Sequence, residues 1–267
     1  MMSNTNYGYL FGKDYYRGAS YDIKDQERFF NAKHQPFFED IFDFPETSPP
    51  PLTQFDLVTR YPGLTLGTGY GHGVKNVVGD FKIGFFFDHT TGLPVIPGSS
   101  IKGMLRSVFP CATGKHQHKN TSDEIKKAKR AYIRKLLAKD DLFNVDNLEL
   151  EIFEGKDFCK KQGNGLIPVP LRDTFLDAEI VQGNGTGHIF GDDYITPHID
   201  PESRKPAPLK NPIPLRFLKI LPNVTFRFSF ELHDGLITKE QKLTLFRQIL
   251  LDQGVGAKTN VGYGRLK

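Results

Sequence analysis

Tryptophan is absent from this sequence of 267 residues, and cysteine is nearly so, with only Cys111 and Cys159. Two cysteines cannot form a disulfide framework, so the composition excludes a disulfide-rich secreted protein and favours a reducing compartment. No run of about 18 apolar residues occurs, which excludes a transmembrane helix. The first residues, Met-Met-Ser-Asn-Thr-Asn-Tyr, lack the basic and apolar stretches of a secretory signal. We therefore expect a cytoplasmic protein without a membrane partner.

A strong net charge is lacking as well. The formal charge is +4 and the pI is near 8.9, an excess too small to indicate nucleic-acid binding by itself. The local placement of charge must therefore decide. Phenylalanine, in contrast, is abundant, because 23 of them occur in a chain that is 38% hydrophobic. This supplies a sizeable core for one large domain or two small ones.

Carboxylates are missing from the last fourteen residues, Gly-Val-Gly-Ala-Lys-Thr-Asn-Val-Gly-Tyr-Gly-Arg-Leu-Lys at 254–267. Four glycines there let the backbone take positive φ angles and bring its N–H groups against a ligand. Successive N–H groups form an anion-sized concavity, which Lys258, Arg265 and Lys267 surround with positive charge. The stretch predicts a phosphate-binding loop. In the alternative interpretation, Gly254 merely ends a helix and the chain continues into a closing edge strand over 262–266.

This loop does not predict a nucleotide hydrolase. A Walker P-loop needs Gly-Lys-Ser/Thr leading directly into a helix. Here Ala257-Lys258-Thr259 is followed by Asn-Val-Gly-Tyr-Gly, which cannot start one. The backbone of a polymer of phosphates fits the pattern better.

A second cationic motif without a carboxylate is Thr-Gly-Leu-Pro-Val-Ile-Pro-Gly-Ser-Ser-Ile-Lys-Gly-Met-Leu-Arg-Ser at 91–107. Ser99 or Ser100 is expected to cap a helix. Its exposed side carries Lys102 and Arg106 one turn apart, beside small residues that leave room for a ligand backbone. Helix N-termini and serine hydroxyls bind phosphate readily. The alternative is an ordinary amphipathic helix with solvated cations, buried through Ile101, Met104, Leu105 and Val108.

A third glycine-rich stretch, 67–73, contains Tyr70 and His72. Its GxG spacing says little alone, because no helix follows it. Alternating patterns predict strands on both sides, over 55–61 and 81–87.

The N-terminal residues 1–50 are rich in tyrosine and phenylalanine. They are predicted to form an arm that packs its rings on this domain's own sheet or on a neighbouring subunit, with a short helix at 23–31. The proline cluster at 49–51 ends the arm, and a single main domain is expected over 51–267.

A basic helical insertion is predicted at about 111–165. Thr121 and Glu124 form a capping box, and the apolar stripe would contain Ile125, Ala128, Tyr132 and Leu136. The other faces carry Lys126, Lys127, Lys129, Arg130, Arg134 and Lys135. Such a face is typical of a solvated surface, and the alternative is a secondary contact with RNA or a subunit.

Two groups of residues have side chains that could bind a metal. Cys111, His116, His118 and Cys159 could bind zinc, although their spacing matches no standard finger. Asp192 and Asp193 could hold a metal, but adjacent carboxylates in a loop are more often solvated or capping. No cofactor or metal is expected.

The remaining pattern predicts strands over 175–181, 215–221 and 226–232. A helix capped by Thr238 and Gln241 would follow, with Leu243, Phe246 and Leu250 on its buried face, and Gly254 would end it. Short strands with two main helices indicate the α+β class, plausible as the ferredoxin-like β-α-β-β-α-β plan.

The motifs at 91–106 and 254–265 together resemble the signatures of the RAMP superfamily, the repeat-associated proteins of CRISPR systems. Two further stretches, Tyr-Pro-Gly-Leu-Thr-Leu-Gly-Thr-Gly-Tyr-Gly-His at 61–72 and Asp-Tyr-Ile-Thr-Pro-His at 193–198, are similar to the family of sixth RAMP subunits of the type III-B, or Cmr, effector complex. The resemblance covers about residues 55–110 and 165–267. It does not extend to the arm or the basic insertion.

The resemblance implies an RNA-recognition-like ferredoxin fold with a C-terminal glycine-rich loop. It implies a subunit that binds CRISPR RNA near the 3′ end of that RNA, while the CRISPR RNA is paired with target RNA. The subunit is expected to be non-catalytic. The subunit would cap the filament of backbone RAMP subunits and contact the small helical subunit and a tip RAMP. Backbone contacts would leave the bases free to pair. The RNA-binding residues would be Tyr70, His72, Gly98, Ser99, Ser100, Lys102, Arg106, Gly254, Gly256, Lys258, Thr259, Asn260, Gly262, Tyr263, Gly264 and Arg265.

Two other classes of function stay open. A RAMP endoribonuclease could use His72 as a general base, or Asp80 as the aspartate that lies upstream of the Pro-Gly-Ser-Ser motif in backbone RAMPs. No partner for His72 is evident, and the predicted strand over 81–87 does not suit the mobile loop that Asp80 would need. A pure protein–protein adaptor would leave two cationic glycine motifs without a purpose.

Overall fold

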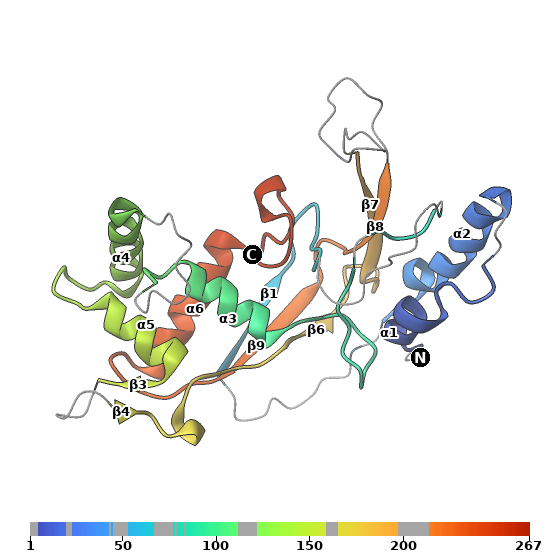
Figure 1. Ribbon diagram of the computed structural model, residues 1–267. Coiled ribbons are helices and arrows are strands. Elements are labelled where there is room, and N and C mark those ends of the chain that lie inside the picture. The colour runs from blue at the N-terminus through green and yellow to red at the C-terminus, as the bar shows by residue number, and fades with distance from the viewer. Residues whose placement is uncertain are drawn as a thin grey trace.

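The computed structural model describes residues 5–19, 23–42, 44, 53–66, 77, 79–82, 84–111, 122–158, 165–196 and 214–267. Helices and strands are mixed along the chain, so the predicted α+β class is confirmed. None of the helices in these ranges is long and apolar enough to cross a membrane. The helices α4 (Asp123–Leu137) and α5 (Val145–Glu154) lie at one end of the molecule and α1 (Tyr7–Tyr9) and α2 (Ile23–Glu39) at the other, with the central strands between them (Figure 1).

An antiparallel sheet of five strands forms the centre. Strands β1 (Thr53–Val58), β9 (Thr225–Glu231), β6 (Ala178–Gln182) and β2 (Val95–Ile96) lie in that order, and β5 (Thr174–Phe175) also pairs with β9. On the free side of β1, Leu266 makes an antiparallel bridge to Thr59. The predicted closing strand over 262–266 is therefore wrong except at Leu266, because residues 262–264 form a turn instead, directly after the 3-10 turn at Thr259–Val261. The predicted strand over 175–181 is divided between β5 and β6.

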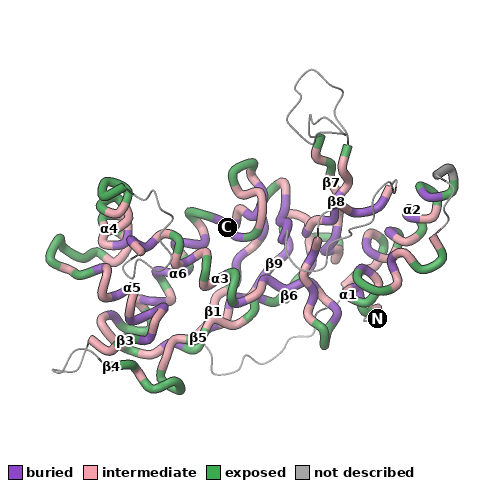
Figure 2. Tube along the Cα trace, viewed as in Figure 1, coloured by how far each residue is buried: buried purple, intermediate pink, exposed green. Residues whose placement is uncertain are grey.

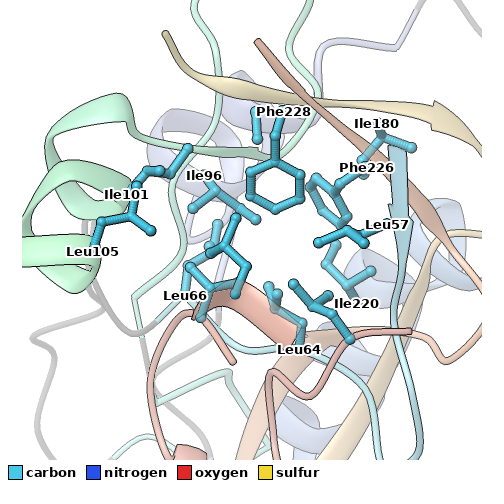
Figure 3. Packing of buried hydrophobic residues seen from close by; sticks show 14 of the residues in the cluster. Leu57, Leu64, Leu66, Ile96, Ile101, Leu105, Ile180, Ile220, Phe226 and Phe228 are labelled. Atoms are coloured by element: carbon cyan, nitrogen blue, oxygen red, sulfur yellow. The ribbon is translucent and has the colours of Figure 1, made fainter. Parts of the chain in front are cut away.

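The core follows from the alternation in β9. Phe226, Phe228 and Phe230 are each 0% exposed, as the pattern predicts. Burying one such ring contributes about 1.5–3 kcal/mol. Figure 3 shows Phe226 and Phe228 among aliphatic side chains from β1 and from the helix that carries Ile101. The buried residues run through the middle of the molecule (Figure 2).

Two helices, α3 (Gly98–Ser107) and α6 (Lys239–Gln253), contact each other and the sheet. The predicted capping box at the start of α6 is confirmed, because the Thr238 and Gln241 side chains each accept the other residue's backbone N–H. Gly254 ends α6 with a φ angle of 78°, also as predicted. The buried face differs slightly from the prediction, since Leu243 is only partly buried, while Leu245, Phe246, Ile249 and Leu250 are buried.

The insertion contains α4 (Asp123–Leu137) and α5 (Val145–Glu154). The predicted capping box is wrong, because Ser122, not Thr121, caps α4 by accepting the Ile125 N–H. The predicted stripe is also turned, since Ile125 is 47% exposed whereas Ile133 is 0% exposed. The reason is tertiary: α4 packs against α5 and α6, and the Tyr132 hydroxyl donates to Asp252 of α6 at 2.7 Å.

Three of the six cations of α4 form bonds inside the fold. Arg130 makes a bidentate ion pair with Asp146 at 2.7 and 3.0 Å. Arg134 donates to the Phe143 carbonyl at 3.0 Å, and Lys129 donates to the Ser107 carbonyl of α3 at 2.7 Å. Arg130 and Arg134 therefore hold α4 to the rest of the insertion, and Lys129 holds the insertion to α3, which a fully solvated face would not do.

A second, two-stranded sheet pairs β7 (Phe190–Ile195) with β8 (Leu215–Ile220). The predicted strand over 215–221 is thus confirmed. Asp192 pairs with Arg216 at 2.6 Å and Asp193 with Lys219 at 2.8 Å. Cross-strand ion pairs therefore replace the solvated, capping or metal-binding roles considered for these aspartates.

The N-terminal arm contains α1 (Tyr7–Tyr9), η1 (Leu10–Asp14) and α2 (Ile23–Glu39), which is longer than the predicted helix over 23–31. The arm packs on its own chain: the Phe11 ring lies 5.5 Å from that of Phe87 and 6.4 Å from that of Phe81. The predicted strand over 81–87 is wrong, since its described residues form only isolated bridges, such as Phe87 with Pro94. Its rings are buried by the arm rather than by a flat sheet.

The Tyr15 hydroxyl links the arm to this aromatic cluster. It accepts the Phe81 N–H at 2.7 Å and lies 2.6 Å from His34 Nε2 of α2. Tyr15→Phe leaves the buried N–H without an acceptor, so we expect it to lower the free energy of unfolding by about 2 kcal/mol. Tyr9→Phe, at a residue 51% exposed, is the control and should change little. Chemical denaturation measures both, and equal midpoints would contradict the role of Tyr15.

Candidate functional site

The two glycine-containing motifs form the walls of one groove of about 360 Å³. Helix α3 contributes Ser100, Met104 and Ser107. Gln253 at the end of α6 lines the groove, and the C-terminal loop contributes residues 254–257 and Thr259. Leu66, the last described residue before the third glycine-rich stretch, lines the groove as well. Among the described residues that line the groove, none carries a charge. A ligand backbone would therefore meet small side chains and peptide groups there.

The loop, residues 254–265, needs its glycines for close approach. Gly264 has a φ angle of 70°, and a Cβ there would lie 1.8 Å from the Val255 carbonyl oxygen. Gly256 has a φ angle of 87°, and a Cβ would lie 2.6 Å from the Thr65 oxygen. At these two positions positive φ and crowding together require glycine.

Most N–H groups of the loop are used to build it. Val255 donates to Gly264 at 2.9 Å, Ala257 to Thr65 at 2.7 Å and Gly264 to Gly63 at 2.8 Å. In the segment 256–260, the N–H groups of Gly256, Lys258, Thr259 and Asn260 donate to no acceptor among the described residues. These four belong to the segment that borders the groove. They are the donors that an anion could accept from.

The N-terminus of α3, which forms the other wall of the groove, differs from the prediction. Neither Ser99 nor Ser100 caps α3: the N-cap residue is Pro97, and the Gly98 N–H donates to Asp177 at 2.7 Å. A carboxylate from across the chain thus occupies the helix N-terminus, which the prediction assigned to phosphate. Gly98 itself is buried, and both serines are exposed. Farther along, no described atom lies within 4 Å of the place a Cβ on Gly103 would take, so this face of the helix is open.

The predicted cations have different environments. Arg106, whose side chain is only 17% exposed, pairs with Glu154 at 2.6 Å and lies 3.7 Å from Glu149. Its expected place on a solvated face is wrong, because α5 of the insertion covers it. Arg265 donates to the Asp252 carbonyl at 2.9 Å. The ammonium groups of Lys102 and Lys258 lie 5.6 and 6.0 Å from the ring centroids of Phe175 and Phe217.

Tyr263 is an anchor of the loop. It is 8% exposed, and its hydroxyl donates to Asp193 of β7 at 2.6 Å. Burial raises the pKa of Tyr263, and the neighbouring Asp193 raises it further. Burial alone would raise the pKa of Asp193, but hydrogen bonds from Lys219 and Tyr263 hold it below its usual value. The hydroxyl therefore stays protonated and holds the loop to β7.

Some positions that sequence reasoning missed lie at the groove. Met104 and Gln253 line it. Lys129, through its bond to Ser107, places a cation at one end of the α3 wall. Only the density of cations in 126–135 hinted at Lys129.

The predicted residues Asn260 and Gly262 lie at the turn of the loop, where Asn260 is exposed.

Several predicted residues lie outside the described part of the chain, namely Tyr70, His72, Thr121, His116, His118 and Cys159. Cys111 is described and is a free thiol. The possibility of a zinc site therefore stays open, and the roles of Tyr70 and His72 stay predictions. Asp80 is described and is 1% exposed; it accepts from the Tyr16 hydroxyl at 2.6 Å and pairs with Lys82 at 2.5 Å.

Comparison with known proteins gives a family and one curated relative. The family model described as the RAMP superfamily matches residues 56–267. The chain is 30% identical over 199 residues to the CRISPR system Cmr subunit Cmr6 of Pyrococcus furiosus, covering 66% of this chain and 58% of that relative. The chain thus spans less than two thirds of the length of the curated relative.

Two solved structures are also similar. A cryo-EM structure of the type III-B Cmr-beta complex bound to cognate target RNA contains a chain 24% identical, with a TM-score of 0.48 over 80% of this chain and 57% of that one. The crystal structure of Cmr6 from Pyrococcus furiosus is 21% identical, with a TM-score of 0.44 over 80% of this chain and 97% of that one. By the match of the family model over most of its length, this chain belongs to the RAMP superfamily.

Proposed function

We propose that the chain is a non-catalytic subunit of a type III-B (Cmr) effector complex that holds the backbone of CRISPR RNA near its 3′ end. The relative named a Cmr subunit supports membership of such a complex. The partners would be the guide RNA with its paired target, the backbone RAMP, the small helical subunit and the tip RAMP. The RNA would lie in the groove between α3 and the C-terminal loop.

One observation carries this proposal. Two motifs about 150 residues apart in sequence meet at one groove, and four N–H groups of the segment 256–260 have no acceptor among the described residues. Lys258, between the groove-lining Ala257 and Thr259, adds positive charge there. Lys102 lies on the other face of α3, with its ammonium 5.6 Å from the Phe175 ring centroid. Donors of this kind recognise phosphate without reading bases, which is the contact a guide needs if its bases are to pair with a target.

The sheet order supports the ferredoxin-like plan for this domain. We assign β1, α3, β6, β9, α6 and the residues around Leu266 as its six elements. Their spatial order, Leu266 then β1, β9 and β6, is antiparallel throughout. On this assignment residues 51–267 form one domain, with α4 and α5 inserted between α3 and β6, and residues 1–50 are its arm.

Binding through phosphates makes a specific prediction about salt. The logarithm of affinity for single-stranded RNA should fall with that of salt concentration by about 0.7 per phosphate neutralised. Lys258→Ala should reduce this slope by about that amount and weaken RNAs of unrelated sequence equally. Lys239→Ala, at an exposed residue away from the groove, is the control and should leave the slope unchanged. Filter binding at several salt concentrations measures both, and a loss confined to one RNA sequence would contradict backbone recognition.

The proposed lack of catalytic activity can be tested separately from RNA binding. Asp80 is buried and engaged by Tyr16 and Lys82, so it has no access to a ribose. Asp80→Asn and His72→Ala complexes that assemble fully should therefore cleave target RNA at the parental positions, within about twofold of its rate. Gel analysis of the products measures this. Disappearance of a single cleavage product from an intact complex would make the chain a nuclease.

A further inference from the structure

A surface segment of six consecutive apolar residues runs from the end of β4 (Gly165–Leu166) through η2 (Val169–Leu171). Its sequence is Leu-Ile-Pro-Val-Pro-Leu, at 166–171. Leu166 is 64% exposed, Val169 71% and Leu171 52%. Both prolines are exposed as well. Single exposed apolar side chains are ordinary, but a contiguous patch marks an interaction surface. We call residues 166–171 the apolar hexapeptide.

The fold holds the apolar hexapeptide in place. The Ile167 N–H donates to the Gly155 carbonyl at 2.7 Å, and Arg172 Nε donates back to the Ile167 carbonyl at 2.7 Å. The Leu171 N–H closes a turn on the Pro168 carbonyl at 2.9 Å. A partner would therefore meet a surface that is already ordered, which lowers the entropy lost on binding.

Beside the apolar hexapeptide lies a pocket of about 360 Å³, distinct from the groove. Three residues of the hexapeptide line it, together with Asp173 and residues from α5, β3 (Lys156–Asp157), α6 and the segment after β9. Its charged lining consists of four carboxylates and one ammonium, namely Glu151, Asp157, Asp173, Asp234 and Lys242. The ammonium already pairs with Asp173 at 2.6 Å. It also lies 3.7 Å from Glu151. The formal charge of this described lining is negative, which favours a cation over phosphate.

We propose that this surface docks another protein through a segment that is both basic and apolar. A lysine or arginine of the partner would enter the pocket, and neighbouring apolar side chains would cover Leu166, Val169 and Leu171. Charge complementarity and the exposed apolar area argue for this occupant over RNA. Only the source of the segment, a neighbouring subunit of the same complex, rests on the proposed function.

The first test uses the isolated full chain and does not depend on the complex. The probe is a synthetic peptide of alternating leucine and lysine, and its counterpart carries glutamate in place of lysine. We expect the lysine peptide to bind and the glutamate peptide not to bind. Asp234→Asn, which keeps the oxygen that accepts the Lys239 N–H, should weaken binding about threefold. Val169→Asn with Leu171→Asn should weaken it about tenfold.

Leu142→Asn is the matched control, because Leu142 is 91% exposed in the turn between α4 and α5. It should leave peptide affinity unchanged. Equal binding of the two peptides, or equal losses in the Leu142 and Val169/Leu171 variants, would overturn the proposal. RNA affinity, measured on the same variants, should stay at the parental value. A loss of RNA binding in the Lys258 variant with peptide binding intact separates the two sites.

The second test places a photocrosslinking amino acid at Val169 or at Leu142 in the assembled complex. Crosslinks from position 169 should map to a segment of another subunit that contains lysine or arginine beside apolar residues. Crosslinks from position 142 should not map there. If position 169 reacts with RNA, with this chain's own residues, or no more than position 142, the docking proposal is wrong.

Discussion

Replacing Gly264 with alanine is expected to lower the free energy of unfolding by about 3 kcal/mol or more and to reduce RNA affinity at least about tenfold. The new Cβ would lie 1.8 Å from the Val255 carbonyl oxygen, at a φ angle of 70°. Positive φ alone costs about 1–2 kcal/mol for alanine, and the backbone must also shift to relieve the clash. That shift breaks the hydrogen bond from Val255 to Gly264, which closes the loop.

Two glycines provide graded controls for this variant. Gly262→Ala has a similar backbone strain, at a φ angle of 100°, but its nearest neighbour, Pro62 Cδ, would be 3.6 Å away. It should cost only about 1–2 kcal/mol. Gly103→Ala, in the helix interior with open space around it, should stabilise by about 0.5–1 kcal/mol. If Gly264→Ala is as mild as Gly262→Ala in denaturant titration, the close packing of the loop is not what maintains it.

The buried ion pair at Lys242 carries the second large prediction. The side chains of Lys242, Asp173 and Glu151 are each at most 3% exposed, and Lys242 also donates to the His233 carbonyl at 2.8 Å. Lys242→Met preserves the length of the side chain but leaves two buried carboxyl groups without their cation. We expect a loss of about 3–5 kcal/mol of stability. Lys239→Met, exposed one turn earlier on α6, should change stability by less than about 0.5 kcal/mol.

The pH dependence of the stability tests whether the effect of Lys242→Met is electrostatic. Burial raises the pKa of Glu151 above its ordinary value of 4.5, against the lowering effects of the Leu236 N–H and Lys242. Because the folded state then binds more protons than the unfolded state, stability falls as pH rises from 4.5 through the raised value. Glu151→Gln should abolish that fall. In Lys242→Met, protonation of Glu151 on acidification relieves part of the unpaired charge, so the deficit should shrink as the pH falls. A deficit independent of pH would contradict the electrostatic cause.

Patterns that act within a few residues could be predicted from the sequence. The capping box of Thr238 and Gln241, the alternating phenylalanines of β9 and the helix end at Gly254 depend on neighbours in the chain. The meeting of the two motifs at one groove was expected only through the family resemblance. Within the sequence itself, the two motifs share a lack of carboxylates and an abundance of glycine, and this similarity was the indication that they act together.

Features set by distant parts of the chain could not be predicted. Asp177 occupies the start of α3, although Ser99 and Ser100 supply the local capping pattern. Arg106 is covered because α5 brings Glu154 to it. The alternation in 81–87 is typical of a strand, yet its rings face the arm, and the N-terminal aromatic residues bury them there. In each case a tertiary contact overrides a local pattern.

The placement of RNA in the groove is tested most directly by photocrosslinking. The full chain would be irradiated with single-stranded RNA that contains 4-thiouridine, and the modified peptides identified by mass spectrometry. The account predicts that nucleotides attach to peptides from both walls, residues 99–107 and 254–265, and that Lys258→Ala reduces both attachments together. Attachment to α4 or to residues 166–171, with both walls unmodified, would contradict it.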